Sequence, residues 1–315
     1  MVKHLKNKLY VIAVVSNPIR FKRRWELYRK FEYHALNHGA QLITVECQQG
    51  DREFQITDKE NPRHVQVRTY DELWIKENMI NLAFSKLPSD WEYVAWVDAD
   101  ITFVRPDWLE ETIHQLQHYQ IVQMWQTAID LGPNQETIST HYSFIHQYLS
   151  GRDYHYGKKG NYYELWHPGF GWAARREAID HLGGLIEIAI LGAADNHMSH
   201  AFVGLLDFTI GKGLHPNYLK HLKIWQERAE RYIRRDVGIV PGTIIHYWHG
   251  KKKDRRYHDR WKILVNNQFD PEIDIKKDSQ GILQLHDHGT PRSIKLRDDI
   301  RKYFRGRNED TIDLT

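Results

Sequence analysis

The stretch YVAWVDADITFV, residues 93–104, carries the strongest signal in the chain. Its first five residues are apolar or aromatic, as in a strand buried within a sheet. The run ends at Asp98-Ala99-Asp100, after which the apolar pattern resumes. Residues i and i+2 of an extended segment project to the same side, so the two carboxylates could share one divalent cation, Mg²⁺ or Mn²⁺. Taken alone, the triplet is explained equally well by two solvated acids at a strand end.

The composition is that of an ordinary globular protein. The 315 residues suffice for one large domain or two small ones, and 41% of them are hydrophobic. Eleven Trp and twenty His exceed what a core requires, so we expect some of them to line a site. A net charge of +3 does not by itself imply nucleic acid binding. The single cysteine, Cys47, excludes an internal disulfide, fits a reducing compartment and lies in a predicted buried strand.

The N-terminal sequence combines a basic start, MVKHLKNK, with the apolar run LYVIAVV, as signal peptides do. The apolar run is short, however, and it ends in Ser-Asn-Pro without a small-residue cleavage site. It therefore fits a first β-strand better. No stretch approaches the roughly 20 apolar residues of a membrane span. We expect a soluble, cytoplasmic protein without membrane insertion.

Apolar runs and helical periodicity alternate along the first 130 residues. This alternation predicts an α/β fold whose mostly parallel central sheet is flanked by helices. Ligands of such sheets bind beyond the carboxyl ends of the strands, and Asp98 and Asp100 fall at one of these ends. The expected strands are 9–15, 41–47, 93–97 and 121–125, and the expected helices are 22–37, 72–87 and one that Asp107 and Glu110 would cap.

The remainder of the chain is less regular. Residues 131–165 are rich in Gly, Tyr, His and Asn and are predicted to form a long surface segment with a short helix. Beyond about residue 266 the chain becomes polar and charged. This composition predicts a loosely packed C-terminal tail with one helix near 292–304.

Four further segments surround the Asp-x-Asp strand in a recognisable order. They are SNPIRFKRRWELYRKF (16–31), WIKENMINLAF (74–84), GFGWAARREAIDHLGGL (169–185) with LGAADNHMSHAF (191–202), and IIHYWHGKKKDRRY (244–257). The ordered set resembles the GT-A glycosyltransferases, nucleotide-sugar-dependent enzymes with a Rossmann-like fold, over roughly residues 9–260. Similar sequences are known mainly from phages and large viruses, which points to a viral source and the host cytoplasm.

The resemblance implies a metal-dependent glycosyltransferase that moves a sugar from a nucleotide sugar, UDP-linked by preference, to an acceptor hydroxyl. Residues 1–265 would form the GT-A-like domain, and residues 266–315 a C-terminal extension. Within the domain, the nucleotide-sugar half would cover about 1–130 and the irregular acceptor half about 131–265. The cofactor, Mn²⁺ or Mg²⁺, would neutralise the diphosphate leaving group as charge develops on it.

The metal site would combine the Asp-x-Asp carboxylates with a late histidine. His246 and His249 are three residues apart, so only one of them is expected to be a ligand. We favour His249, because Gly250 and three lysines follow it directly and could reach the diphosphate. The expected metal ligands are Asp98, Asp100 and one of the two histidines, His249 by preference or otherwise His246.

The donor site would also use basic residues. The run that starts at Lys251 is equally consistent with a solvated face and with a mobile phosphate-binding loop. For Lys76, a solvated helix face is the simpler alternative. The expected donor-binding residues are Ser16, Asn17, Arg20, Arg23, Lys76, Asn81, Asp98, Lys251 and Lys252.

The acceptor site would involve the segment that contains Trp172 and the helix start at Asp195. Two glycines in the segment permit close backbone approach to a ligand. Trp172 could stack on a sugar or base, although a turn with core aromatics explains it nearly as well. Asp195 would be the general base, with a helix N-cap as the alternative. The expected acceptor- or sugar-binding residues are His167, Gly169, Phe170, Gly171, Trp172, Asp195 and Asn196.

The stereochemical outcome depends on Asp195. Many relatives carry Glu-Asp or Asp-Asp where this chain has Asp195-Asn196, so Asp195 is the one carboxylate there for the base role, with His197 as a weaker rival. If Asp195 is the base, the reaction inverts the anomeric centre. If Asp195 only binds the acceptor, a retaining route is open, and the sequence does not decide between the two.

The acceptor itself has two candidates: a glycan, and a hydroxymethylated pyrimidine of viral DNA. Transfer to duplex DNA would require base flipping, and aromatic side chains would hold the flipped base.

Two other classes of protein are alternatives to a transferase. One is a non-catalytic nucleic-acid- or sugar-binding module on a degenerate transferase fold. The other is a Mg²⁺-dependent nuclease or phosphotransferase, which would need more acids around the metal than the sequence offers.

Overall fold

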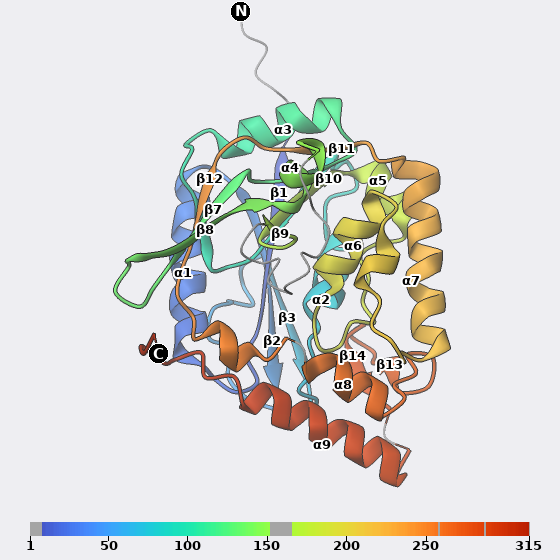
Figure 1. The fold of residues 1–315 in the computed structure, drawn as a ribbon. Coiled ribbons are helices and arrows are strands. Elements are labelled where there is room, and N and C mark those ends of the chain that lie inside the picture. Colours follow the sequence, from blue (N-terminus) through green and yellow to red (C-terminus); the bar gives the residue numbers. More distant parts are fainter. Residues whose placement is uncertain (1–7, 152–165, 258, 287, 315) are drawn as a thin grey trace, which may run out of the picture.

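A seven-stranded sheet forms the centre of the computed structural model, which describes residues 8–151, 166–257, 259–286 and 288–314 (Figure 1). The strand order is β11-β6-β10-β4-β1-β2-β3. All neighbours pair in parallel except β10, which is antiparallel to both β4 and β6. The predicted α/β fold with a mostly parallel sheet is therefore confirmed. The strands are β1 (Leu9–Ser16), β2 (Gln41–Gln49), β3 (His64–Thr69), β4 (Tyr93–Val97), β6 (Ile121–Gln123), β10 (Gly171–Arg175) and β11 (Val237–Ile239).

The sheet is buried on both faces because its central strands are apolar at consecutive positions. In β1, Val11 belongs to one core cluster and Ile12 to another, so successive side chains fill opposite layers. The strands β1, β2 and β4 agree closely with the ranges expected from the sequence. Cys47 is buried in β2, as predicted.

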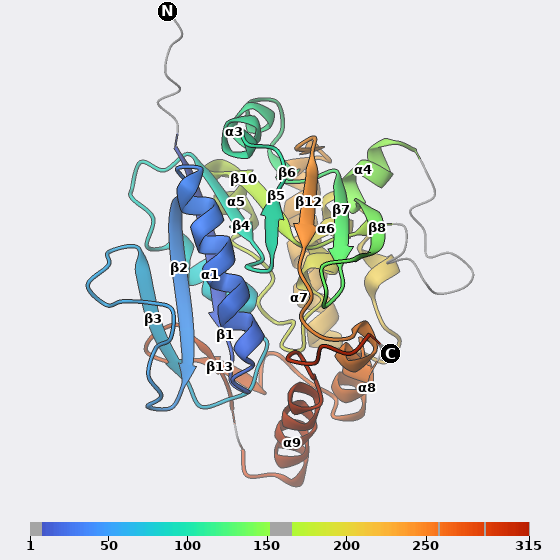
Figure 2. The same ribbon diagram turned by 90° about the vertical axis from the view of Figure 1, so that its left-hand side faces the viewer.

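Helices cover the two faces of the sheet separately (Figure 2). Apolar side chains of α1 (Lys22–Asn37) and α3 (Trp108–His118) pack on one face. Those of α2 (Lys76–Phe84), α5 (Arg176–Leu182), α6 (Ala194–Phe202) and α7 (Pro216–Arg228) pack on the other. The range of α1 matches the expected one, whereas α2 is shorter than predicted. The expected side-chain cap at α3 is wrong, because the Asp107 carboxylate pairs with Arg105 instead.

A second sheet of five strands lies beside the first and aligns His246 with residues of two neighbouring strands. Its order is β5-β12-β7-β8-β9. His246 in β12 is aligned with Ile101 of β5 on one side and with Asp130 of β7 on the other. Strand pairing thus brings together residues that are distant in sequence. The strands are β5 (Ile101–Phe103), β7 (Thr127–Leu131), β8 (Thr137–Ser143), β9 (Trp166–His167) and β12 (Thr243–His246).

The segment predicted as irregular surface, 131–165, contains more structure than expected where the structure describes it. Strand β8 and the short helix α4 (Phe144–Leu149) occupy much of its first half. The short helix was expected. Residues 152–165 lie outside the described residues.

The prediction of a loosely packed C-terminal tail is wrong. A helix near 292–304 does form, as α9 (Pro291–Arg305), but Leu296, Ile300, Tyr303 and Phe304 of its apolar face are buried in the main core. The tail also contains the hairpin β13 (Ile275–Lys277) and β14 (Leu283–Leu285), and it is preceded by α8 (Asp259–Asn266). Within the described ranges, every helix is too short or too polar to cross a lipid bilayer.

Candidate active site

A pocket opens at the carboxyl ends of β1 and β4, where the sheet topology predicts a ligand site. Ser16 and Asn17 line it from the end of β1, and Lys76 lines it from the start of α2. Asp98 and Asp100 line it from the turn after β4, and the late histidine His249 reaches the same space. Residues expected at the donor and metal sites are therefore neighbours here.

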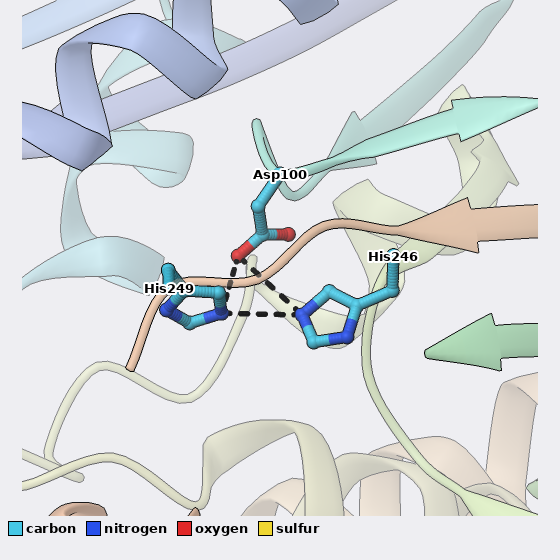
Figure 3. A group of neighbouring side chains, drawn as sticks. All are labelled: Asp100, His246 and His249. Carbon is cyan, nitrogen blue, oxygen red and sulfur yellow. Dashed lines mark hydrogen bonds and ion pairs between the residues drawn. The ribbon is translucent and has the colours of Figure 1, made fainter. Parts of the chain in front are cut away.

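Asp100, His246 and His249 form a cluster at this pocket (Figure 3). Nε2 of His249 lies 3.1 Å from Oδ2 of Asp100 and 3.1 Å from Nε2 of His246. Nε2 of His246 lies 3.9 Å from the same carboxylate oxygen. Both histidines, rather than one of the two, thus reach Asp100.

The chemistry of these groups fits a divalent cation. His249 is nearly buried, and burial together with Arg255 lowers its pKa to about 4, so the ring is neutral at physiological pH. Burial alone would raise the pKa of Asp100, but His249, His246 and Arg255 outweigh burial and hold it far below its ordinary value. Oδ1 of Asp100 is buried without a hydrogen-bond partner among the described residues. A carboxylate and two imidazoles that converge in this way are typical metal ligands.

Asp98 lies outside this cluster and pairs with a different residue. Lys76 donates to Oδ1 of Asp98. The shared-cation prediction assumed an extended backbone, but β4 ends at Val97 and residues 99 and 100 form a turn. The amide of Asp98 donates to the carbonyl of Phe170, 2.7 Å away. The turn therefore directs the two carboxylates to different partners.

Asp195 lies close to this pair. It is the second residue of α6, whose N-cap is Ala193, so the expected N-cap role is wrong. Its Oδ1 accepts from the Asn196 amide at 2.8 Å. The carboxylates of Asp98, Glu77 and Asp195 together outweigh burial and raise the pKa of Lys76. Asp195 thus lies near Lys76, although Lys76 lines the pocket and Asp195 does not.

The segment before β10 brings backbone to the carboxylate of Asp195. A Cβ atom at Gly169 would lie 2.7 Å from Oδ2 of Asp195, so a larger residue would displace that side chain. Phe170 has a positive φ of 73°, and its ring stacks on His167 and contacts His246. The segment thereby connects Asp195 with the cluster of Asp100, His246 and His249.

Three of the predicted site residues, Trp172, Asn81 and Arg20, do not line the pocket. Trp172 is buried in β10, and its indole donates to the carbonyl of Pro168, so it is unavailable for stacking on a ligand. Asn81 binds the backbone of Leu185 and the side chain of Glu187, away from the pocket lining. Arg20 is exposed and lies over the ring of Trp25.

The remaining predicted residues lie around the basic loop, residues 248–257. Nε of Arg23 donates to the carbonyl of Trp248 at 2.9 Å. Lys252 pairs with Asp130 at 2.7 Å and keeps half of its side chain exposed. Lys251 precedes the short 3₁₀ turn of 252–255. Arg255 points inward, and its Nη2 lies 3.0 Å from Nε2 of His249. Within the basic loop, Lys252 is thus half exposed to solvent, whereas Arg255 contacts His249.

Three charged residues that the sequence did not indicate also line the pocket: Arg24, Arg307 and Glu309. Arg24 donates to Oε1 of Glu309 at 2.7 Å, and Nε of Arg307 lies 2.9 Å from the same oxygen. Glu309 is almost fully buried. The neighbouring Asp310 accepts from the amides of Lys22 and Arg23 at the start of α1. The polar sequence of the tail gave no signal for this role.

Comparison with solved structures gives distant likenesses. No family model and no curated protein matches the chain. The catalytic domain of Drosophila beta1,4galactosyltransferase 7 in complex with xylobiose is 14% identical, with 91% of this chain and 98% of that chain covered and a TM-score of 0.40. A mutant of that enzyme in complex with manganese, UDP-Gal and xylobiose has the same identity and coverage and a TM-score of 0.42.

A third solved structure is the mannosyltransferase PcManGT from Pyrobaculum calidifontis, in complex with GDP-Man and Mn²⁺. It is 15% identical, with 83% of this chain and 61% of that chain covered and a TM-score of 0.38. All of these scores are low. The function proposed below therefore depends on the residues of the site.

Proposed function

We propose that the protein is a metal-dependent glycosyltransferase that transfers a sugar from a nucleotide sugar, UDP-linked by preference, to an acceptor hydroxyl. The observation that carries this proposal is the cluster of Asp100, His246 and His249 at the pocket where β1 and β4 end. Cationic side chains border the same pocket, as a diphosphate requires. A carboxylate suited to proton abstraction, Asp195, lies beside them.

The metal would be held by Asp100, His246 and His249. A divalent cation bound there would neutralise the charge that develops on the leaving diphosphate. Two imidazoles and one carboxylate favour Mn²⁺ over Mg²⁺, which prefers oxygen ligands alone. The same ligand set also suits Fe²⁺ in oxygenases, but the surrounding cations favour a phosphate ligand.

Charged side chains of the protein would bind the diphosphate and accept the proton of the acceptor. Lys76 and Lys252 would orient the diphosphate and stabilise its charge. Asp195 would accept the proton of the acceptor hydroxyl during attack on the anomeric carbon. Gly169 would let the backbone approach that carboxylate closely. With Asp195 as the base, the reaction proceeds by single displacement with inversion.

Calorimetric titration of UDP tests the donor site. We expect binding in the presence of Mn²⁺ that EDTA abolishes and that Asp100→Ala and His249→Ala lose. Asp207→Asn is the matched control, because Asp207 is an exposed carboxylate that the site does not use. Absence of UDP binding under all conditions, repeated with GDP and other nucleotides, would contradict the proposal. Binding that is independent of metal, without turnover of donor, would instead indicate a non-catalytic module.

The acceptor is proposed to be a glycan hydroxyl, with the hydroxymethyl group of a modified pyrimidine in viral DNA as the second candidate. A radiolabelled UDP-sugar, offered with oligosaccharides, with hydroxymethylated DNA and with unmodified DNA, separates the two. Label in an oligosaccharide alone would eliminate the DNA acceptor. Label in hydroxymethylated but not in unmodified DNA would eliminate the glycan.

A further inference from the structure

Asp130 connects the metal cluster with the basic loop. It lies in β7, directly opposite His246 of β12, and is 2% exposed. Nδ1 of His246 lies 2.8 Å from its Oδ1. Nζ of Lys252 and Oγ of Ser139 each lie 2.7 Å from its Oδ2. Each of the two carboxylate oxygens therefore has a partner, and none of these partners is Asp100 or His249.

The contacts of Asp130 determine which nitrogen of His246 carries the proton. A buried carboxylate in contact with an ammonium group is ionised, and an ionised carboxylate only accepts hydrogen bonds. Nδ1 of His246 must therefore be the donor. In this tautomer the lone pair lies on Nε2, the atom that faces Asp100 and His249.

We propose that Asp130 is a positioning residue of the metal centre, which holds His246 in the Nδ1–H tautomer with Nε2 directed at the cation. This inference rests on the proposed metal site. A carboxylate behind a ligating imidazole fixes the ring orientation and increases the basicity of the ligating nitrogen. By binding Lys252 as well, Asp130 fixes the middle of the basic loop relative to His246.

The tautomer can be measured on the unaltered protein. In ¹⁵N NMR spectra of protein labelled at histidine, the His246 ring is assigned as the signal that disappears in His246→Gln. We expect the Nδ1 of His246 to carry the proton in the metal-free protein near neutral pH. A proton on Nε2 would overturn the proposal without reference to any variant of Asp130.

Metal affinity provides the second test, by electron paramagnetic resonance titration with Mn²⁺ alone. Asp130→Asn keeps the size of the side chain and an accepting oxygen but removes the charge. We expect Asp130→Asn to bind Mn²⁺ about 10- to 100-fold more weakly than the wild type. Ser139→Ala removes only the hydroxyl group that donates to Asp130, and it should bind as the wild type does.

The two proposals fail in different ways. A wild type that binds no Mn²⁺ would refute the metal site, and with it the proposed function. A wild type that binds Mn²⁺, with Asp130→Asn of equal affinity and native thermal unfolding, would refute the role of Asp130 alone. If Asp130→Asn does not fold, the tautomer of the wild-type His246 decides the question.

Discussion

Lys76, at the start of α2, forms an ion pair with Asp98 at the end of β4. The two side chains are 19% and 24% exposed, so the pair is screened from water only in part. Asp195 adds a second negative charge near the same ammonium group. The pair connects α2 to the turn that carries Asp100. As a result, Asp98 and Asp100 have different partners.

Removal of the Lys76 charge should destabilise the fold. In Lys76→Met the carboxylate of Asp98 loses its cation while Asp100 and Asp195 remain nearby, which we expect to cost about 2 kcal/mol, less than for a fully buried pair. The double variant Lys76→Met, Asp98→Asn should recover most of this loss. Lys76→Arg keeps the charge and is the control. Urea unfolding gives the free energies, and equal stability of Lys76→Met and Lys76→Arg would contradict the prediction.

Asp195 should affect turnover and not donor binding. In Asp195→Asn the side chain keeps its size but can no longer accept a proton, so we expect kcat to fall by about 10²- to 10⁴-fold. UDP binding in the presence of Mn²⁺ should be unchanged. Asp180→Asn, at an exposed position on α5, is the control.

The anomeric configuration of the product, read by NMR, completes this test. Inversion is expected if Asp195 is the base. Near-normal kcat in Asp195→Asn, with retention of configuration, would show that Asp195 only binds the acceptor.

The sequence was sufficient to predict the central sheet, and it placed the candidate site at the strand ends where the pocket lies. The apolar runs of β1, β2 and β4 are long enough to exclude exposed strands, and their alternation with helices implies parallel pairing. Asp100 and the late histidines were recognisable because hard and borderline ligands at strand ends suggest metal chemistry. For these elements, local pattern and final position agree.

Other parts of the site depend on pairing across the chain, which no local pattern specifies. Asp98 was expected to share a cation with Asp100 on the assumption of an extended backbone, whereas the structure has a turn after Val97 and pairs Asp98 with Lys76. Asp130 reaches His246 only through the register of β7 and β12. Glu309 reaches Arg24 over 285 residues of sequence. Such contacts become visible only when the fold is known.

His197 should make the fold sensitive to acid. It is fully buried in α6 between Thr209 and Tyr218, and burial lowers its pKa to about 3. Its ordinary pKa near 6.5 applies in the unfolded chain, so the unfolded state binds the proton first. The contribution of His197 is therefore complete above pH 6.5 and is lost as the pH falls toward 3, by about 2 kcal/mol at pH 5.

Urea unfolding of the wild type and of His197→Gln between pH 5 and pH 8 isolates the pH-dependent contribution of His197 to the free energy of unfolding. His197→Gln should be less stable at pH 8 because it loses the contacts of the ring, and its stability should fall less steeply with acid. Parallel pH profiles would contradict the prediction. The burial of His197 also removes it as a rival base to Asp195.

Glu309 should show that the C-terminal segment belongs to the folded site. Its carboxylate is the shared partner of Arg24 and Arg307, and all three line the pocket. Glu309→Gln removes the negative charge and leaves two largely buried guanidinium groups without it. We expect a loss of about 3 kcal/mol in the free energy of unfolding, because an uncompensated buried charge costs more than a missing contact.

Asp313→Asn is the matched control for Glu309→Gln, because it removes a carboxylate from the same segment at an exposed position. The double variant Arg24→Met, Glu309→Gln should be more stable than the sum of the single changes predicts, since it removes one of the two unpaired cations. If Glu309→Gln instead unfolds as the wild type and Asp313→Asn do, the guanidinium groups are solvated. The C-terminal segment would then cover the pocket without stabilising it.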